Sequence, residues 1–304
     1  MSDLVHDHAA FPSRWGADDR IGAGNLLTPA GRVAALSMVQ SGEVVDLGHV
    51  IADGAPRIPP DQTPYLMSLT TRSRSVVKHL DSYKVENRFG ANLERIEMTT
   101  HVGTHIDALG HVTVGDRMYN GLSADDMVGD YGLKQLGVEN IPPIITRGVL
   151  LDVSGLDGGP MLEAGRAVGL DDIKRARDAA GVELRDGDVV CIHTGWGSLF
   201  MQDNARYVKG EPGIDLDAAE FLTANGAVAI AADNMAVEVM PNPRHPKVIM
   251  PVHQHTLVDS GVYLIENLKL DELVTMGRNE FCFVLLATKF KGATGCPVRP
   301  VALF

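Results

Sequence analysis

The sequence predicts an α/β protein with a mixed β-sheet and flanking helices. Helix and strand patterns alternate along the second half of the chain, and its strands are continuous runs of Val, Ile and Leu, as in RGVLLDVS (147–154). Such runs are typical of strands buried on both faces, in a sheet covered by helices. With 304 residues, 45% of them hydrophobic, the chain is long enough for a large core. No internal repeat or linker divides it, so we expect one domain.

Residues 1–42 predict a coil and a helix that wrap a core formed by residues 43–304. Residues 1–25 contain Pro and Gly without a regular pattern, which is typical of an ordered coil. The helix is expected to begin at Thr28 as N-cap with Pro29 as its first residue, and to stop at Gly42.

Residues 43–143 predict two strands and long irregular segments. EVVDLGHV (43–50) and RIEMTTHVGTH (95–105) have strand character. Between them, residues 52–64 carry four prolines and predict a loop that either wraps the body or covers a binding site. Residues 112–143 are rich in Gly and Pro, so we expect a mostly irregular connection.

The remaining elements follow in alternation. Acidic residues early and a glycine at the end predict a helix at 170–181. The other expected elements are a helix at 215–226 and strands at 147–154, 186–195, 227–234, 261–268 and 281–290.

Charge and composition exclude several function classes. Thirty-nine acidic against 27 basic residues give a net charge of −12, which disfavours nucleic acid and anionic membranes as partners. No stretch approaches the roughly 18 apolar residues of a membrane span, and MSDLVHDHAAFPSRWG lacks the features of a signal peptide, so a cytoplasmic location is expected. Three cysteines without CxxC spacing predict neither disulfides nor a thiolate metal site, and Cys191 and Cys282 are expected to be core residues. No GxSxG, Walker or GxGxxG motif is present.

The segment HVGTHIDALGH (101–111) predicts a metal site. It holds three histidines and an aspartate, although the whole chain has only 11 histidines. Imidazole and carboxylate together suit zinc or manganese better than calcium or magnesium. We therefore expect His101, His105 and Asp107 to bind a divalent cation.

The spacing of these residues requires a bend in the chain. A straight strand would hold His101 and His105 about 13 Å apart, too far for one ion with bonds near 2 Å. Gly103 is the residue that can bend, because glycine tolerates a bulge or a positive φ. His111 has three possible roles: general base for bound water, fourth ligand, or structural histidine.

The same segment resembles the HxGTHxDxPxH signature of the cyclase-like metal-dependent hydrolases, which include bacterial kynurenine formamidase and isatin hydrolase. The resemblance extends to GDVVCIHTGW (187–196), to the Asp-Asn pair at 233–234 and to HQHTLVDSGVYLIENL (253–268). WGADDRIGAGNLLTP (15–29) is similar to the lead-in of the longer members. Leu109 departs from the pattern, since many relatives have proline there.

By position, the resemblance implies site residues. His101, His105 and Asp107 match metal ligands, and His111 matches the catalytic base. His253 and Glu266 match residues that hold a second ion in the two-metal members, with Asp107 as the bridge. Without the resemblance, His253 at a helix start and Glu266 at a strand end would be interpreted as structural residues. His255 competes with His253 for the site.

The resemblance also implies a fold related to swivelling β/β/α domains, and assembly as a homodimer or homotetramer. It favours a hydrolase that opens a cyclic amide or cleaves an N-formyl or aryl amide of a small molecule, with one or two Mn²⁺ or Zn²⁺ ions. The alternatives are a metal-dependent cyclase, dehydratase or isomerase acting on a small carbonyl compound, and a non-enzymatic metal-binding or small-molecule-binding protein. Six residues are equally consistent with pocket lining and with plain packing: Trp15, Asn25, Tyr65, Met67, Trp196 and Phe200.

Overall fold

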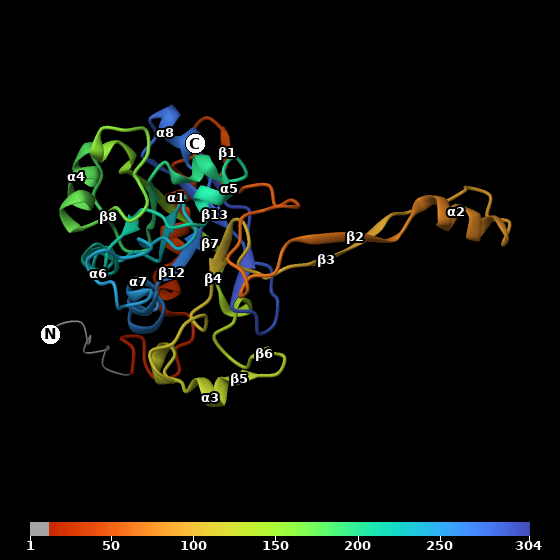
Figure 1. Cartoon of the computed structure of the whole chain (residues 1–304), viewed down its shortest axis with the longest axis horizontal. Coiled ribbons are helices and arrows are strands. Elements are labelled where there is room, and N and C mark those ends of the chain that lie inside the picture. The colour runs from red at the N-terminus through yellow and green to blue at the C-terminus, as the bar shows by residue number, and fades with distance from the viewer. Residues whose placement is uncertain (1–11) are drawn as a thin grey trace.

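The computed structural model describes residues 12–304, and its centre is a nine-stranded mixed β-sheet (Figure 1). In sheet order the strands are β1 (Val44–Asp46), β15 (Val301–Leu303), β13 (Glu280–Leu285), β7 (Ile144–Asp152), β9 (Val189–His193), β11 (Ala229–Ala232), β12 (Tyr263–Glu266), β4 (His105–Asp107) and β14 (Gly295–Pro297). The four inner strands from β7 to β12 are parallel, and the strands on both sides of them are antiparallel. The predicted α/β fold with a mixed sheet is confirmed.

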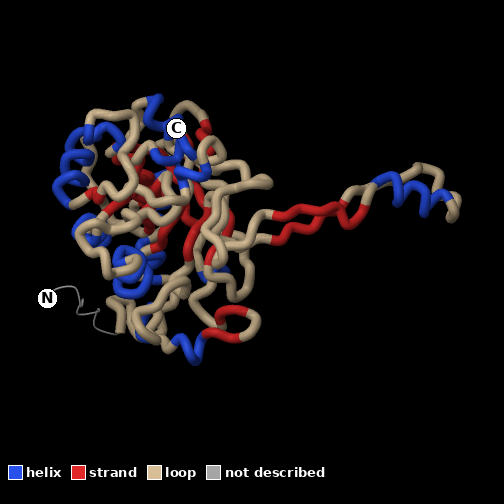
Figure 2. Tube along the Cα trace, in the orientation of Figure 1, coloured by secondary structure: helices blue, strands red, loops and turns tan. Residues whose placement is uncertain are grey.

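Helices surround the sheet, which occupies the middle of the body (Figure 2). They are α1 (Pro29–Leu36), α3 (Ala124–Met127), α4 (Leu170–Ala180), α5 (Asn204–Tyr207), α6 (Leu216–Ala224), α7 (Pro251–His253) and α8 (Asp271–Met276), with α2 (Ser73–Asp81) outside the body. A π-helical segment, Gln254–Ser260, continues α7. Short 3₁₀ turns lie at Gly22–Leu26, Tyr119–Gly121, Val138–Asn140, Ser154–Asp157 and Trp196–Leu199. The remaining strands form three small pairs: β2 (Leu66–Thr71) with β3 (Leu93–Glu97), β5 (Val128–Gly129) with β6 (Gly132–Leu133), and β8 (Ala167–Val168) with β10 (Gly213–Ile214).

The predicted helices form where their caps are found. The Thr28 side chain accepts a hydrogen bond from the Gly31 amide, and Pro29 is the first residue of α1. This helix ends at Leu36 and not at Gly42, because the amides of Ser41 and Gly42 bind the Phe304 carbonyl instead. Helices α4 and α6 lie within the predicted ranges, and the segment 112–143 is mostly irregular as expected.

The parallel strands form the core. Every residue of β9, β11 and β12 is buried, as their continuous apolar sequences predict. Cys191 lies in β9, Cys282 in the antiparallel strand β13 and Cys296 in β14, and all three are buried free thiols. Strands β14 and β15, near the C-terminus, have no counterpart in the sequence prediction.

Three strand predictions are wrong in their extent. The segment 95–105 is not one strand, because β3 ends at Glu97, a turn follows, and β4 begins at His105 in a different sheet. The strand predicted at 43–50 stops at Asp46, after which Gly48 makes only an isolated bridge with Leu268. The strand predicted at 281–290 similarly ends at Leu285.

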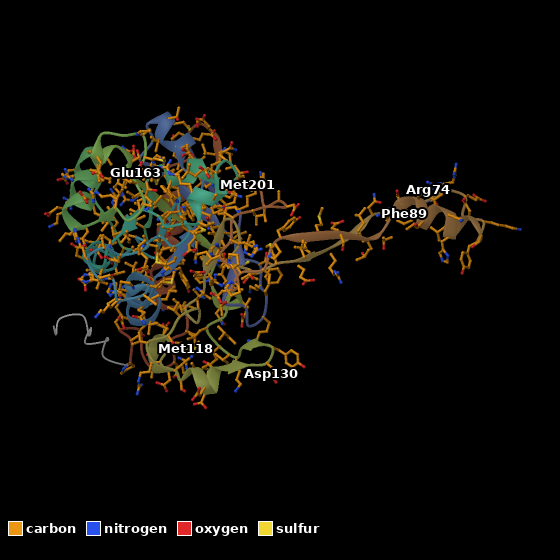
Figure 3. The ribbon with its side chains drawn as sticks, viewed as in Figure 1. Arg74, Phe89, Met118, Asp130, Glu163 and Met201 are labelled. Carbon is orange, nitrogen blue, oxygen red and sulfur yellow. The ribbon has the colours of Figure 1, made fainter. Side chains whose placement is uncertain are left out.

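An arm projects from the body (Figure 1), and we define it as residues 66–97. It consists of β2, α2 and β3, and none of the residues in these three elements is buried. Figure 3 places Arg74 and Phe89 in its outer part, far from the sheet. No helix or strand was predicted from the sequence between residues 66 and 92. Within residues 12–304, no helix combines the length and apolar character needed to cross a bilayer.

Candidate metal centre

Pairing of β4 with β12 brings His105, Asp107 and Glu266 of the site together. His105 and Asp107 are the ends of β4, and Glu266 is the last residue of β12. The two strands are antiparallel, with Glu266 opposite His105 and Leu264 opposite Asp107. Residues that are 161 positions apart in the sequence therefore become direct neighbours.

The predicted bend at Gly103 is present. Gly103 has a φ of +73°, which an L side chain rarely adopts. A Cβ at this position would also lie 2.6 Å from Cγ1 of Ile51. The bend turns the Gly103 carbonyl toward the His105 ring, whose Nδ1–H donates to it over 2.8 Å. As a result, Nε2 of His105 faces Glu266 Oε2 at 3.2 Å and Asp107 Oδ1 at 3.5 Å.

His101 reaches Asp107 from the turn before β4. Its Nδ1 lies 2.8 Å from Asp107 Oδ1, and its Nε2 lies 3.0 Å from the Thr294 hydroxyl. Gly295 leaves room for the ring, because a Cβ there would overlap it. Thr294 and Gly295 thus orient His101, a role that the sequence analysis missed.

His253, and not His255, faces the site. Its Nε2 lies 3.2 Å from Glu266 Oε1 and 3.7 Å from Asp107 Oδ2. The buried Glu238 carboxylate holds its other nitrogen, with Nδ1 at 2.6 Å from Oε1. Nε2 of His255 lies instead 2.9 Å from the Thr223 hydroxyl, on α6. Glu238 is a second residue that the sequence analysis did not identify.

His111 joins the same group through ring stacking. Its ring lies 4.1 Å from the His101 ring, centroid to centroid, and 6.2 Å from that of His253. The turn that carries it closes with a hydrogen bond from the His111 amide to the Ala108 carbonyl, and Leu109 is buried within this turn. The structure therefore brings together all six residues proposed for the site.

The arrangement fits a metal ion. His105 Nε2 and both carboxylate oxygens of Asp107 are buried and make no hydrogen bond of acceptable geometry, although imidazole or carboxylate atoms lie 2.8 to 3.7 Å from them. Such atoms are costly unless something binds them. In the described part of the chain, two groups have ligand atoms close enough to hold a cation: His101, Asp107 and His111, and His105, Asp107 and Glu266. Asp107 belongs to both. The mixture of imidazole and carboxylate suits zinc or manganese.

The negative charges of Glu266 and Asp107 also favour a cation at this site. Burial alone would lower the pKa of His105, but Glu266 and Asp107 outweigh it and raise this pKa to about 10. Burial lowers the pKa of His111 to about 4, against the opposing effect of Asp107. The ring of His111 is therefore neutral at pH 7.

A cavity of about 680 Å³ opens beside these residues, a volume within the usual range for small-molecule sites. His101, His111, His253 and Glu266 line it together with an apolar wall that includes Met235 and Met240. Glu211 and Lys209 also line it, and the sequence analysis proposed neither.

The six residues named as possible pocket lining lie elsewhere. Trp196 and Phe200 pack with Tyr207 in a separate buried cluster. Tyr65 and Met67 lie at the root of the arm, Trp15 packs against the main core, and Asn25 binds Asp19. Packing is thus the role of Trp15, Trp196 and Phe200, whereas Asn25 and Met67 are exposed, and Tyr65 and Met67 line a separate surface pocket beside Ile51.

The model of the Cyclase family matches residues 45–239, more than half of the chain. The chain belongs to the cyclase family. Of the solved structures, that of a novel cyclase is 28% identical with a TM-score of 0.84, over 95% of this chain and 98% of that one. The cyclase fold is also shared with isatin hydrolase A from Labrenzia aggregata bound to benzyl benzoate, at 21% identity and a TM-score of 0.61, over 89% of this chain and 96% of that one. A predicted metal-dependent hydrolase from Bacillus stearothermophilus is 20% identical with a TM-score of 0.52, over 86% of this chain and 97% of that one. No curated protein matches the chain.

Proposed function

We propose that this cyclase-family protein is a metal-dependent hydrolase that opens a cyclic amide or cleaves an N-formyl or aryl amide. His101, His105 and Asp107 would hold a Mn²⁺ or Zn²⁺ ion. The observation that carries the proposal is the convergence of buried imidazole and carboxylate atoms around Asp107, with no well-formed hydrogen bond to satisfy His105 Nε2 or the Asp107 oxygens. The hydrolases among the structural neighbours support it, since they share this fold.

A second ion would use the remaining residues. His253 lies near Oδ2 of Asp107 and near Glu266, whereas His101 lies near Oδ1 of Asp107, and Asp107 belongs to both groups of possible ligands. This geometry supports Asp107 as a bridge between two ions. Glu238 would fix the orientation of His253, as carboxylates do for histidine ligands.

The chain's own residues would handle the proton. A divalent cation held by these residues would polarise a carbonyl and would lower the pKa of bound water to about 7. His111 lines the cavity as a neutral ring and would accept the proton of the attacking water, then return it to the leaving nitrogen. His101, stacked against it, would hold the His111 ring in place.

The family name keeps a second reaction class open. A cyclisation, dehydration or isomerisation could use the same cation to polarise a carbonyl. Hydrolysis consumes one water and produces a carboxylate, so product analysis separates the two classes. A binding protein without activity is the remaining alternative, and it would turn over nothing when fully loaded with metal.

Metal analysis of the purified protein, coupled to a hydrolysis screen, tests the proposal. The screen covers isatin, N-formylkynurenine, cyclic imides and simple lactones. We expect ring opening or deformylation that a chelator abolishes and that Mn²⁺ or Zn²⁺ restores. Turnover indifferent to both treatments would contradict the proposal.

We also propose that the arm docks on a second copy of the chain, in a homodimer or homotetramer. The arm exposes the large apolar side chains of Leu66, Met67, Leu69, Tyr83, Phe89, Leu93 and Ile96, whereas a two-stranded hairpin alone is marginally stable. The arm, residues 66–97, contains six basic and four acidic residues, a net charge of +2. Since the chain total is −12, the rest carries −14. A basic, apolar arm is thus complementary to the acidic body of another copy.

The cytoplasmic location stays a prediction.

A further inference from the structure

Gln254 directly follows His253 and connects the helix of that residue to the segment that carries His111. Its Nε2 donates a hydrogen bond to the main-chain carbonyl of Thr113 over 3.0 Å, although the two residues are 141 positions apart in the sequence. Thr113 lies two residues after His111, and the Gln254 side chain is half-buried. The contact therefore joins the neighbours of two site residues, and the proposed chemistry does not use it.

The helix around Gln254 presents successive side chains to different parts of the molecule. His253 faces the metal centre, His255 contacts α6, and Gln254 reaches a third element. Gln254 is also the first residue of the π-helical segment Gln254–Ser260. Such segments are rare in proteins and occur frequently at functional sites. Here the wider helix begins directly after the residue that faces Asp107.

The His111 ring has no hydrogen bond that fixes its position. Within residues 12–304, the interactions of the ring are its stacking on the His101 ring, at 4.1 Å between centroids, and an edge contact with the His253 ring at 6.2 Å. Stacking leaves a ring free to slide in its own plane. The position of the ring therefore depends on the main chain that carries it.

The main chain of residues 111–113 is attached at two points in the described part of the chain. The His111 amide donates to the Ala108 carbonyl over 3.0 Å, and the Thr113 carbonyl accepts from Gln254. The first bond closes a local turn. The second ties this stretch to an element that is distant in the sequence, so it sets the place of the stretch within the fold.

The π-helical segment and the chain after His111 also meet at a second place. Gly261, which ends the π-helical segment, lies against the Tyr119 ring, and a Cβ on this glycine would come within 2.5 Å of a ring carbon. The two elements thus pack as one unit. Gln254 sets their spacing at the end that lies near His111.

We propose that Gln254 is a positioning residue, which fixes the His111 ring relative to His253 through the hydrogen bond to the Thr113 carbonyl. The inference rests on the proposed function for the role of His111 as the base. A general base must lie within hydrogen-bond reach of the proton that it accepts, and a misplacement of about 1 Å can cost on the order of 10²-fold in rate. Gln254 therefore acts on turnover and not on metal binding.

Gln254→Met tests the inference, because methionine is similar to glutamine in length but cannot donate a hydrogen bond to Thr113. The assay uses the metal-loaded protein and the amide that the wild type hydrolyses fastest in the screen. We expect kcat to fall by roughly tenfold or more, while KM and metal content stay unchanged. Gln254→Glu should show a similar loss, since a carboxylate cannot donate either. If Gln254→Met does not fold, Gln254→Glu decides.

The same substitution in a His111→Ala background separates positioning from a general effect on the fold. If Gln254 acts only through His111, then Gln254→Met should leave the residual rate of His111→Ala unchanged. Gln40→Met is the matched control, because Nε2 of the exposed Gln40 also donates to a main-chain carbonyl, that of Ser37, over 2.8 Å. It should change neither rate. Thermal unfolding shows whether each variant is folded.

NMR of the histidine rings makes the test independent of turnover. In zinc-loaded protein with ¹⁵N-labelled histidine, the signals that disappear in His111→Ala belong to His111. Gln254→Met should shift or broaden these signals, because the ring loses its fixed position. The signals of His105, which lies on β4, should stay in place.

Three results would overturn the inference: a wild-type kcat in Gln254→Met, loss of metal in that variant, or an equal fold-loss of rate in the wild-type and His111→Ala backgrounds. If the loaded wild type hydrolyses no amide of the screen, the proposed function fails. In that case the NMR signals decide the role of Gln254 separately, and unchanged His111 signals in Gln254→Met would overturn the inference.

Discussion

The carbonyl oxygen of Gly103 accepts a hydrogen bond from Nδ1 of His105 over 2.8 Å. This contact fixes the tautomer of the ring and directs Nε2 toward Asp107 and Glu266. In the metal-free chain a proton occupies this nitrogen, because the pKa of His105 is raised to about 10. Metal binding at His105 therefore displaces a proton.

Replacing Gly103 with alanine should disturb both the fold and the site. A φ of +73° costs an L residue about 1–2 kcal/mol, and the added Cβ would press on Ile51. We expect a lower free energy of unfolding in urea and weaker metal binding by calorimetry. Gly54→Ala is the matched control, since Gly54 also has a positive φ but has open space around it. Equal metal affinity in the two variants would contradict the role of the bend.

Asp107 should matter more for metal content than Glu266. Because Asp107 belongs to both groups of ligands, Asp107→Asn should remove all bound metal, whereas Glu266→Gln should leave the ion held through His101. Elemental analysis after dialysis measures this. His253→Ala and His255→Ala form a matched pair in which only the first should lower metal content, since His255 contacts Thr223. A Glu266→Gln protein devoid of metal would rule out two separable positions.

His111→Ala should retain metal and lose activity. Loss of a general base lowers kcat by on the order of 10²–10⁴-fold, while His101, His105 and Asp107 remain to bind the ion. Steady-state kinetics with parallel metal analysis separates the roles. If the variant loses its metal as well, His111 is a ligand, as its membership of one ligand group allows.

Because of His193, the free energy of unfolding should decrease as the pH rises into the alkaline range. Its Nδ1 lies 2.8 Å from Asp152, and its Nε2 lies 3.7 Å from Asp271. Burial lowers the pKa of His193, but these carboxylates and Asp233 outweigh burial and raise it to about 10. A raised pKa stabilises the fold fully below about pH 6.5, the ordinary value, and this contribution is lost as the pH rises toward 10. Urea unfolding between pH 6.5 and 10 should show a steeper loss in the wild type than in His193→Gln. Equal slopes would contradict the prediction.

Removing apolar groups from the arm should weaken assembly. If the arm docks on a second copy, Phe89→Ser with Leu93→Ser should raise the dissociation constant of the oligomer by tenfold or more. High salt should weaken the wild-type assembly too, because basic and acidic surfaces meet. Light scattering over a dilution series measures both effects. Tyr131→Ser, which alters a fully exposed ring on another hairpin, is the control. A monomeric wild type would refute the proposal.

The candidate site was predictable only in part, because its residues come from two distant regions of the chain. His101, His105, Asp107 and His111 lie within 11 residues, so their spacing and the need for a bend at Gly103 could be deduced locally. Glu266 and His253 required a family resemblance, since nothing in their own neighbourhoods marks them. Glu211, Glu238 and Thr294 carried no local signal at all.

The fold, too, was predictable only in part from the sequence. Caps and apolar runs predicted α1, α4, α6 and the buried parallel strands, because those elements follow from local periodicity and burial. The predicted extent of the strands in this region was wrong. Pairing with β2 decides the extent of β3, and pairing with β12 decides the extent of β4. The arm was missed because its strands are stabilised by each other and not by a buried apolar face.

By itself, then, the sequence determined the α/β class and the cluster at 101–111 that can bind a metal. Only the tertiary structure decided that Glu266 lies beside His105, that His253 and not His255 faces Asp107, and that Glu238 holds the other nitrogen of His253. The physical reason is that local patterns reflect propensity and burial within a few residues. The register between β4 and β12, and the packing of distant loops, depend on contacts that no short stretch of sequence contains.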